Sequence, residues 1–233
     1  MMNYESRAIS LLYYKYGEGS VIAKVFTEEL GLISYSVRRS KSKKSKNKIS
    51  LLDNQCLISI NGKYNNKKEV QYLNELNLEY AYEDNTFKKK LIRMFMSEVL
   101  SKTLSEAEKN QELFHFVWQK NIDLDRAETV NKEFSLIFLL EMSYYLGIYP
   151  SLENIDFDFF NINRGVFTKE ENKSEYNLFG INLNYFKTLL KNKKTKIPSE
   201  NIRELMEIIF TYYTCHHFDL SSLKSYEIIK SLD

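Results

Sequence analysis

The first part of the chain alternates apolar and polar residues with the period of two that is typical of β-strands. Ile9, Leu11 and Tyr13 alternate, and the glycines of residues 16–20 (YGEGS) then supply a turn. Further strand-like stretches occupy residues 21–25, 32–37, 55–61 and 70–80. Five short strands in 80 residues predict a small antiparallel barrel, because closure removes exposed sheet edges.

After residue 85 the apolar residues recur at helical spacing instead. The pattern predicts helices that begin near Thr86 and Ser199, helices through Leu113–Trp118 and Phe134–Tyr145, a short helix at Tyr185–Leu190 and a last helical turn around Ile228. Residues 157–167 (FDFFNINRGVF) are typical of a short hairpin or an irregular excursion. The predicted fold class is therefore α+β, with a five-stranded barrel at 1–80 followed by an all-α domain at 81–233.

Composition excludes a disordered chain, because 43% of the 233 residues are hydrophobic and 14% are aromatic. The net charge of only +2 argues at first against a nucleic-acid partner. However, residues 1–80 contain 13 Lys and Arg against 8 Asp and Glu, whereas residues 81–233 contain 20 against 23. The nearly neutral total therefore averages a basic barrel and a mildly acidic helical part.

The strongest local signal is the segment 38–48, RRSKSKKSKNK, in which seven of eleven residues are basic and none is acidic. Such a dense run of like charges is stabilised by phosphates, whose neutralisation releases counterions. The alternative is a solvated loop on a lysine-rich protein. We predict a DNA-binding site formed by this run with Lys15, Lys24 and Tyr35; the basic residues of the run are Arg38, Arg39, Lys41, Lys43, Lys44, Lys46 and Lys48.

Aromatic residues of the barrel are candidates for stacking on bases, which tolerates any sequence because every base has a π-face. The candidates are Tyr13, Tyr14, Tyr16, Tyr35 and Tyr64. Each of them could equally belong to ordinary packing. Strand alternation places Tyr13 and Tyr14 on opposite faces, so at most one of these two belongs to a given stacking surface.

Catalytic and metal-binding patterns are weak. The glycines at 17 and 19 lack the third glycine and the following helix of a phosphate-binding fingerprint. Cys215, His216 and His217 are consecutive in a predicted helix, so their side chains diverge. We therefore predict no catalytic residues and no enzyme activity. The two cysteines form no CxxC pair, and no signal peptide or spanning segment is evident, so we expect reduced thiols and a cytoplasmic protein with no membrane partner.

Several ordered motifs resemble the RecO family of bacterial recombinational DNA-repair proteins. They are residues 7–39, with KYGEGS, FTEELG and the following SYSVRRSKSKKSK, and then SEVLSKTL, FLLEMSYYLGIYPSLE and LKSYEIIKSL. The resemblance covers most of the chain and implies an OB-fold followed by a helical domain. It also implies a non-enzymatic mediator that binds single- and double-stranded DNA, promotes annealing, and works with RecR and single-stranded-DNA-binding protein to help load RecA.

Two expectations depend on this resemblance. The acidic C-terminal tail of single-stranded-DNA-binding protein needs a basic-rimmed apolar pocket, for which Lys88, Lys89, Lys90 and Arg93 are candidates. Many family members carry a four-cysteine zinc site after the segment that matches Tyr149–Glu153, but residues 154–167 contain no cysteine. We therefore expect no metal or other cofactor and, in that place, an apolar cluster of Phe157, Phe159, Phe160 and Phe167.

Two other classes of function remain open at this stage. A protein-only adaptor would use the helical domain, with the basic run binding an acidic peptide. An RNA-binding OB-fold protein is the second, because backbone recognition alone does not separate RNA from DNA.

Overall fold

The computed structural model describes residues 2–39, 42, 48–192 and 196–232. The chain divides into two compact units, residues 1–128 and 129–233. The first unit contains the predicted barrel and, after it, two helices among the described residues, so the break between units comes well after the last strand of the barrel. Among the described residues, no helix combines the length and the apolar character that a membrane span requires.

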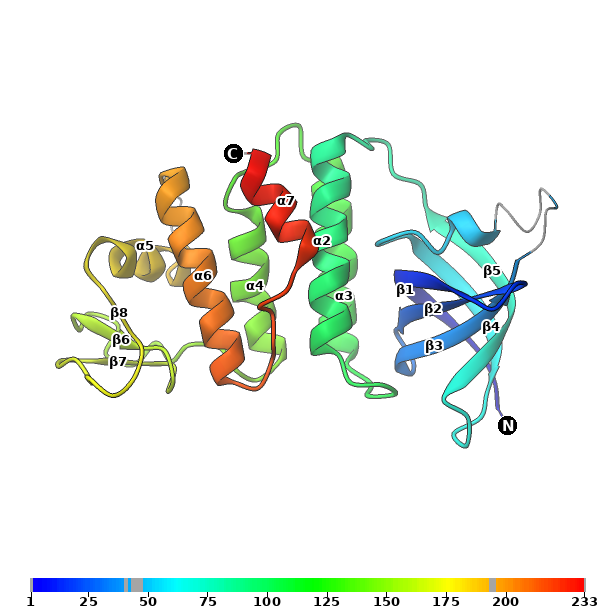
Figure 1. The fold of residues 1–233 in the computed structure, drawn as a ribbon, viewed down its shortest axis with the longest axis horizontal. Coiled ribbons are helices and arrows are strands. Elements are labelled where there is room, and N and C mark those ends of the chain that lie inside the picture. Colours follow the sequence, from blue (N-terminus) through cyan, green and yellow to red (C-terminus); the bar gives the residue numbers. More distant parts are fainter. Residues whose placement is uncertain (1, 40–41, 43–47, 193–195, 233) are drawn as a thin grey trace. The chain divides into compact units, whose positions relative to one another are not determined.

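The five predicted strands are present, and they close into a barrel with the order β1-β2-β3-β5-β4 (Figure 1). Their bounds are β1 (Met2–Tyr16), β2 (Ser20–Thr27), β3 (Gly31–Arg38), β4 (Leu57–Tyr64) and β5 (Val70–Tyr80). All neighbours are antiparallel except β3 and β5, which run parallel. The predicted fold class, a five-stranded barrel followed by helices, is confirmed.

A β-bulge in β1 divides that strand into two halves. The register with β2 shifts between Ser10 and Leu12. Before the shift, the even-numbered residue Ala8 lies in the barrel core. After the shift, the even-numbered residues from Leu12 onward pair with outward-facing residues of β2, so they point outward as well. The interior is filled by a cluster of buried residues: Ala8, Val21, Ala23, Val25, Ile33, Tyr35, Val37, Leu52, Ile58, Ile60 and Leu76.

Two helices complete the first unit, α2 (Phe87–Thr103) and α3 (Gln111–Arg126). Helix α2 packs against β1 and against α3. Helix α3 begins at the cap residue Asn110, whose side chain accepts a hydrogen bond from the Leu113 N–H at 2.9 Å. The Phe114 ring of α3 meets the Phe26 ring of β2 edge to face, with centroids 5.5 Å apart. Helices α2 and α3 therefore cover the part of the barrel's outer surface that is apolar.

The turn between β2 and β3 approaches the backbone before α3 so closely that only glycine fits. Gly31 has a φ of 73°, and a Cβ built on it would lie 2.0 Å from the carbonyl oxygen of Glu108. Ala107 donates its N–H to the Leu32 carbonyl at 2.8 Å, which holds the two segments together.

Gly31→Ala is expected to destabilise the first unit by more than Gly17→Ala, which serves as its matched control. Both positions have positive φ, but nothing lies within 4 Å of a Cβ on Gly17. Gly17→Ala should therefore cost about 1 kcal/mol of strain, and Gly31→Ala should add a backbone clash of about 1–3 kcal/mol. Urea unfolding followed by the fluorescence of the single tryptophan, Trp118 of α3, measures both. Equal losses of unfolding free energy in the two variants would show that the close approach at Gly31 has no energetic cost.

The second unit contains four helices and a small sheet within its described residues. The bounds are α4 (Phe134–Tyr145), β6 (Phe159–Asn161), β7 (Val166–Thr168), β8 (Asn177–Phe179), α5 (Gly180–Leu190), α6 (Ser199–Cys215) and α7 (Lys224–Leu232). The predicted hairpin at 157–167 is present as β6 and β7, but sequence reasoning missed β8, which pairs with the other edge of β6.

The sheet of the second unit packs on its helices through a cluster of aromatic side chains. Phe160 is 1% exposed, and its ring lies 5.0 Å from that of Phe167 and 4.9 Å from that of Phe186. Phe157 and Phe159 are only half-buried. The apolar cluster expected at 154–167 therefore forms around Phe160 and Phe167, with Phe186 of α5 and Tyr212 of α6 as its further members.

Candidate nucleic-acid interface

The basic run begins at one end of the barrel, beside the β1–β2 turn. Arg38, the last residue of β3, pairs with Ser20 of β2, which in turn pairs with Tyr16 of β1. The next N–H, that of Arg39, donates to the Gly19 carbonyl at 2.8 Å. Both arginine side chains are exposed. The pairing therefore fixes where the cationic segment leaves the barrel.

The structure describes three of the other predicted basic contacts to DNA, and each of them is at least partly exposed. Lys15 is exposed near the end of β1, and Lys24 is half-buried on the outer face of β2, opposite Leu12 and Ser34. Lys48 is half-buried at the start of the segment that returns to β4. The remaining lysines of the predicted site, Lys41, Lys43, Lys44 and Lys46, lie outside the described residues.

Three exposed tyrosines share the outer face of the barrel with these cations. Tyr14 pairs with Ile22, Ile22 with Ser36, and Ser36 with Tyr72, so these four residues form one row across β1, β2, β3 and β5. Tyr14 is 50% exposed and Tyr72 62%. Tyr16 is 63% exposed and lies two residues beyond Tyr14 on the same strand face.

Sequence reasoning missed Tyr72. The alternation of Val70 and Tyr72 predicted a strand, but no sequence signal indicated which face of it would be outward. The structure also places Lys63 opposite Tyr72 on β4, and the Lys68 ammonium 5.5 Å from the centre of the Tyr72 ring. Cations and an aromatic ring are therefore adjacent at this site as well.

The assignment of Tyr35 to the interface is wrong. Tyr35 points into the barrel, is completely buried and shares a hydrogen bond between hydroxyl groups with Tyr4. Its ring has no surface on which a base could stack. Tyr64 is half-buried against the same core, whereas Tyr13 is 38% exposed on the inward-facing side of β1.

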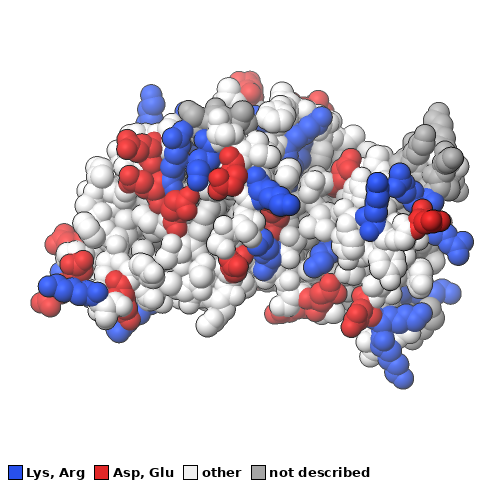
Figure 2. Space-filling model, in the orientation of Figure 1, with Lys and Arg blue, Asp and Glu red and all other residues white. Residues whose placement is uncertain are grey.

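The outer surface of the barrel is not uniformly basic. On the β1–β4–β5 side, Glu5 pairs with Asn61 and Asn61 with Glu75, which gives an acidic row of exposed carboxylates. Figure 2 shows Lys and Arg side chains at several places over the barrel, with carboxylates between them. Repulsion by Glu5 and Glu75 disfavours phosphates at this row.

One barrel cation is committed to an internal contact. Arg7 donates two hydrogen bonds to the Glu28 carboxylate, at 2.9 and 2.8 Å, and His115 of α3 lies 2.7 Å from the same carboxylate. The hydrogen bonds from Arg7, together with His115, lower the pKa of Glu28 to about 2 against the opposing effect of burial. Arg7 therefore links the barrel to α3 and contributes little to a phosphate site.

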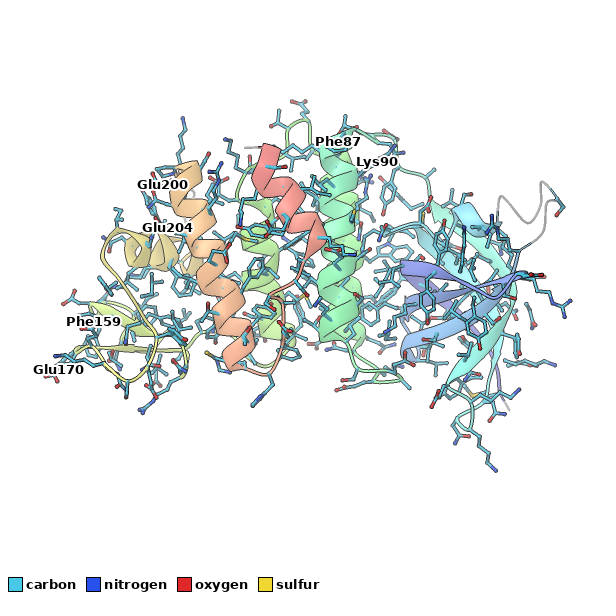
Figure 3. The ribbon with its side chains drawn as sticks, viewed as in Figure 1. Phe87, Lys90, Phe159, Glu170, Glu200 and Glu204 are labelled. Atoms are coloured by element: carbon cyan, nitrogen blue, oxygen red, sulfur yellow. The ribbon has the colours of Figure 1, made fainter. Side chains whose placement is uncertain are left out.

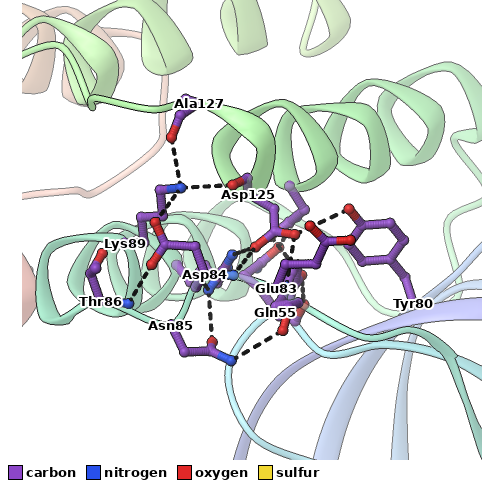
Figure 4. A network of polar contacts seen from close by, with 12 residues as sticks. Gln55, Tyr80, Glu83, Asp84, Asn85, Thr86, Lys89, Asp125 and Ala127 are labelled. Carbon is purple, nitrogen blue, oxygen red and sulfur yellow. Dashed lines mark hydrogen bonds and ion pairs between the residues drawn. The ribbon is translucent and has the colours of Figure 1, made fainter.

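Two of the four residues predicted to rim a partner pocket are structural instead (Figure 4). The buried Lys89 ammonium donates to the carbonyls of Asp125 and Ala127 at 2.7 and 2.8 Å and pairs with Asp84 at 2.8 Å. Arg93 is also buried and pairs with Asp125 at 3.1 Å. Both cations are buried and bonded where α2 packs against α3, so neither is exposed for a partner. The assignment of Lys89 and Arg93 to a partner-binding rim is therefore wrong.

The other two rim candidates are exposed on α2. Lys88 and Lys90 lie on its first turns, where Figure 3 labels Lys90 together with the exposed Phe87. Their role as a partner-binding rim stays a prediction.

In the same network, burial and hydrogen bonding act on the pKa of Asp125 in opposite directions. Burial disfavours its charge, but the N–H groups of Glu83 and Asp84, the Tyr80 hydroxyl and the Arg93 guanidinium together outweigh this and lower its pKa. The network also joins Gln55, which follows the basic segment, to Asn121 of α3 at 2.7 Å and to Ser97 of α2 at 3.0 Å. The return segment after the basic run is therefore anchored to both helices.

In the part of the chain that the structure describes, no three Cys, His, Asp or Glu side chains are grouped as metal ligands. Cys56 and Cys215 are free thiols, and burial raises the pKa of Cys56 to about 11. A thiol with so high a pKa is a poor nucleophile and a poor metal ligand.

Comparison with known proteins agrees with this architecture. A family profile described as "Recombination protein O N terminal" matches residues 1–82, and one described as "Recombination protein O C terminal" matches residues 85–227. The chain belongs to the RecO family. The boundary between the two RecO profiles coincides with the end of β5, where the barrel gives way to helices.

Individual relatives extend the match over the full length. The chain is 31% identical to the DNA repair protein RecO of Flavobacterium psychrophilum and 29% identical to that of Flavobacterium johnsoniae, each over 99% of both chains. It is 27% identical to the RecO protein of Christiangramia forsetii, over 97% of this chain and 98% of the relative. The resemblance in the sequence motifs is thereby confirmed as family membership.

Proposed function

We propose that this chain is a non-catalytic DNA-repair mediator that binds single- and double-stranded DNA on the barrel and anneals complementary strands. The observation that carries the proposal is the position of the basic run. It leaves a RecO-type barrel at the β1–β2 turn, next to an outer face that bears exposed cations and tyrosines. The β2–β3 face and the β1–β2 loop are the surfaces with which OB-folds bind oligonucleotides.

Electrostatics accounts for binding to both forms of DNA. Lys and Arg contact phosphates, which single strands and duplexes share, so these contacts carry no sequence information. Two complementary strands repel each other through their phosphates. A surface with several cations lowers this repulsion for both strands at once, and it raises the local concentration of one strand near the other. Annealing follows from such binding without a catalytic group.

The partners of this mediator are proposed from family membership. They are RecR, the acidic C-terminal tail of single-stranded-DNA-binding protein and, indirectly, RecA. Lys88 and Lys90 are the two remaining candidates for a basic rim that the acidic tail would contact, because both are exposed on α2. The DNA-repair names of the full-length relatives support this assignment to the recombination machinery.

A strand-annealing assay with complementary DNA and RNA oligonucleotides tests the proposal. The protein is expected to accelerate pairing of DNA strands at low salt, and to lose this effect as salt is raised and phosphate contacts are screened. A protein-only adaptor would not accelerate pairing of either nucleic acid, and an RNA-binding protein would act preferentially on RNA. Either of those results would contradict the proposed function.

A further inference from the structure

A pocket of about 280 Å³ lies in the second unit, between α6 and α7. Its apolar lining is formed by one residue of each helix and by two leucines of the segment between them: Phe210, Tyr226, Leu220 and Leu223. These four side chains are at most 7% exposed, and the two aromatic rings meet edge to face with centroids 4.9 Å apart. Typical small-molecule sites have volumes of roughly 300–1,000 Å³. The smaller pocket therefore suits one or two side chains of a partner rather than a nucleotide or a cofactor.

The polar part of the pocket lining is acidic. It includes the exposed carboxylates of Glu207 from α6 and Glu227 from α7. The Lys230 ammonium lies 3.8 Å from the first of these carboxylates and 3.6 Å from the second. The same ammonium is 5.7 Å from the centre of the Tyr226 ring. Two negative charges therefore share one positive charge, and this lysine shows where a cation binds beside the apolar lining.

We propose that this pocket is a docking site for a protein segment in which an apolar side chain stands beside an arginine or a lysine. The apolar side chain packs on Phe210, Leu223 and Tyr226, which supply the apolar surface. The neighbouring cation meets the carboxylates of Glu207 and Glu227. The proposal goes beyond DNA binding by the barrel, because it gives the second unit a protein partner of its own.

Charge determines which partners the pocket rejects. Two carboxylates at its lining repel phosphates and acidic peptides. The acidic tail that is proposed to contact Lys88 and Lys90 is therefore not complementary to this pocket. A basic segment with an apolar residue is complementary in both respects.

Lys230 is a weak competitor for this position. Its side chain is 40% exposed, and exposed ion pairs contribute little to stability because water and salt screen them. An arginine can offer a carboxylate two parallel N–H groups and can stack its planar guanidinium on an aromatic ring. The ring of Tyr176, which also lines the pocket, is 63% exposed and can take this role. An incoming arginine can therefore displace Lys230 at little cost.

Three peptide amides with the same fluorophore at the N-terminus test the proposal by fluorescence anisotropy with the full chain. Gly-Arg-Leu-Phe-Arg-Gly carries both features, Gly-Gln-Leu-Phe-Gln-Gly lacks the charges, and Gly-Arg-Gly-Gly-Arg-Gly lacks the apolar side chains. The first peptide is expected to bind about three- to tenfold more tightly than the second, since two exposed charge pairs are lost. The third should not bind detectably. Equal binding of the first peptide and either control, or no binding of the first up to about 1 mM protein, would overturn the proposal.

Two double variants locate the site. Glu207→Gln together with Glu227→Gln should weaken binding of the first peptide about three- to tenfold and leave binding of the uncharged peptide unchanged. The matched control is Glu200→Gln together with Glu204→Gln, which removes the same charge from the beginning of α6, where Figure 3 labels both residues. These two residues do not line the pocket, so the control should change the affinity by less than about twofold. Equal losses in the two double variants would contradict the site.

Lys230→Gln is expected to act in the opposite direction. Removal of the internal competitor leaves both carboxylates to the peptide, so the first peptide should bind about two- to fivefold more tightly. Lys230 is exposed, and its loss should not unfold the second unit. Weaker or unchanged binding of the first peptide by this variant would show that the lysine does not occupy the position of a partner cation.

Discussion

Arg93→Met is expected to lower the free energy of unfolding of the first unit by about 3–5 kcal/mol, the cost of leaving one partner of a buried ion pair alone. Arg93 and Asp125 are 3% and 1% exposed, and the guanidinium also lies 3.5 Å from the centre of the Tyr82 ring. Methionine keeps much of the stem volume but leaves the Asp125 charge with fewer donors. Urea unfolding monitored by Trp118 measures the loss, because this single tryptophan belongs to the same unit.

Lys90→Met is the matched control for that substitution. Lys90 is on the same helix and is exposed, so its loss should change the free energy by less than about 0.5 kcal/mol. Similar effects of the two substitutions would contradict the structural role of Arg93.

The same pair gives the first unit an acid-sensitive stability. The pKa of Asp125 is lower in the folded state than the value of about 3.9 in an unfolded chain. The stabilisation by its charged form is therefore complete above about pH 4 and is lost as pH falls through the lower folded pKa. Asp125→Asn removes this contribution. The difference in the free energy of unfolding between the unaltered protein and this variant should therefore shrink as pH falls.

Changing Arg38, Arg39, Lys43 and Lys44 together to Ala is expected to weaken single-strand binding about 100-fold near 0.1 M salt. If about four to five phosphates are neutralised by the unaltered protein, its plot of log affinity against log salt should have a slope of about −3, and the variant should have a much shallower slope. Titrations at several salt concentrations provide both quantities. The far-ultraviolet circular dichroism spectrum should not change, because Arg38 and Arg39 are exposed and the lysines belong to the same polar segment.

A control with the same loss of charge separates the basic run from net charge. Four exposed lysines of the second unit, Lys169, Lys173, Lys196 and Lys224, can be changed together to Ala. This variant should retain most of its affinity and its salt slope. Unimpaired binding by the first variant, or an equal loss in the control, would move the DNA-binding surface away from the barrel.

Local patterns were sufficient for most of the architecture. Alternation in residues 1–80 identified five strands, and the change of period after residue 85 identified the helices, because burial of one face imposes periods of 2 and 3.6 on the chain. The strand β8 escaped because its three residues, Asn177–Phe179, are too few to show a period. The division of charge between barrel and helices likewise required only counting.

The side chains of the interface were harder to assign, because exposure depends on pairing across the sheet. Tyr35 looked like any other tyrosine of a basic strand, yet its register with Ala23 directs it into the core. Lys89 and Arg93 looked like a solvated helix face, yet Asp84 and Asp125, from a linker and another helix, bury and neutralise them. Asp125 is more than 30 residues from both cations, so no local pattern contains it.

The sequence by itself determined that this protein has a basic barrel, a helical part and a dense cationic run at residues 38–48. Only the tertiary structure decided which aromatic residues accompany that run. The bulge between Ser10 and Leu12 reverses the facing of β1, so that Tyr14 and Tyr16 turn outward, and Tyr14 comes into one row with Tyr72, more than 50 residues later in the chain. The physical reason is that side chains alternate strictly along a strand, so one extra residue in its middle transfers every later side chain to the opposite face.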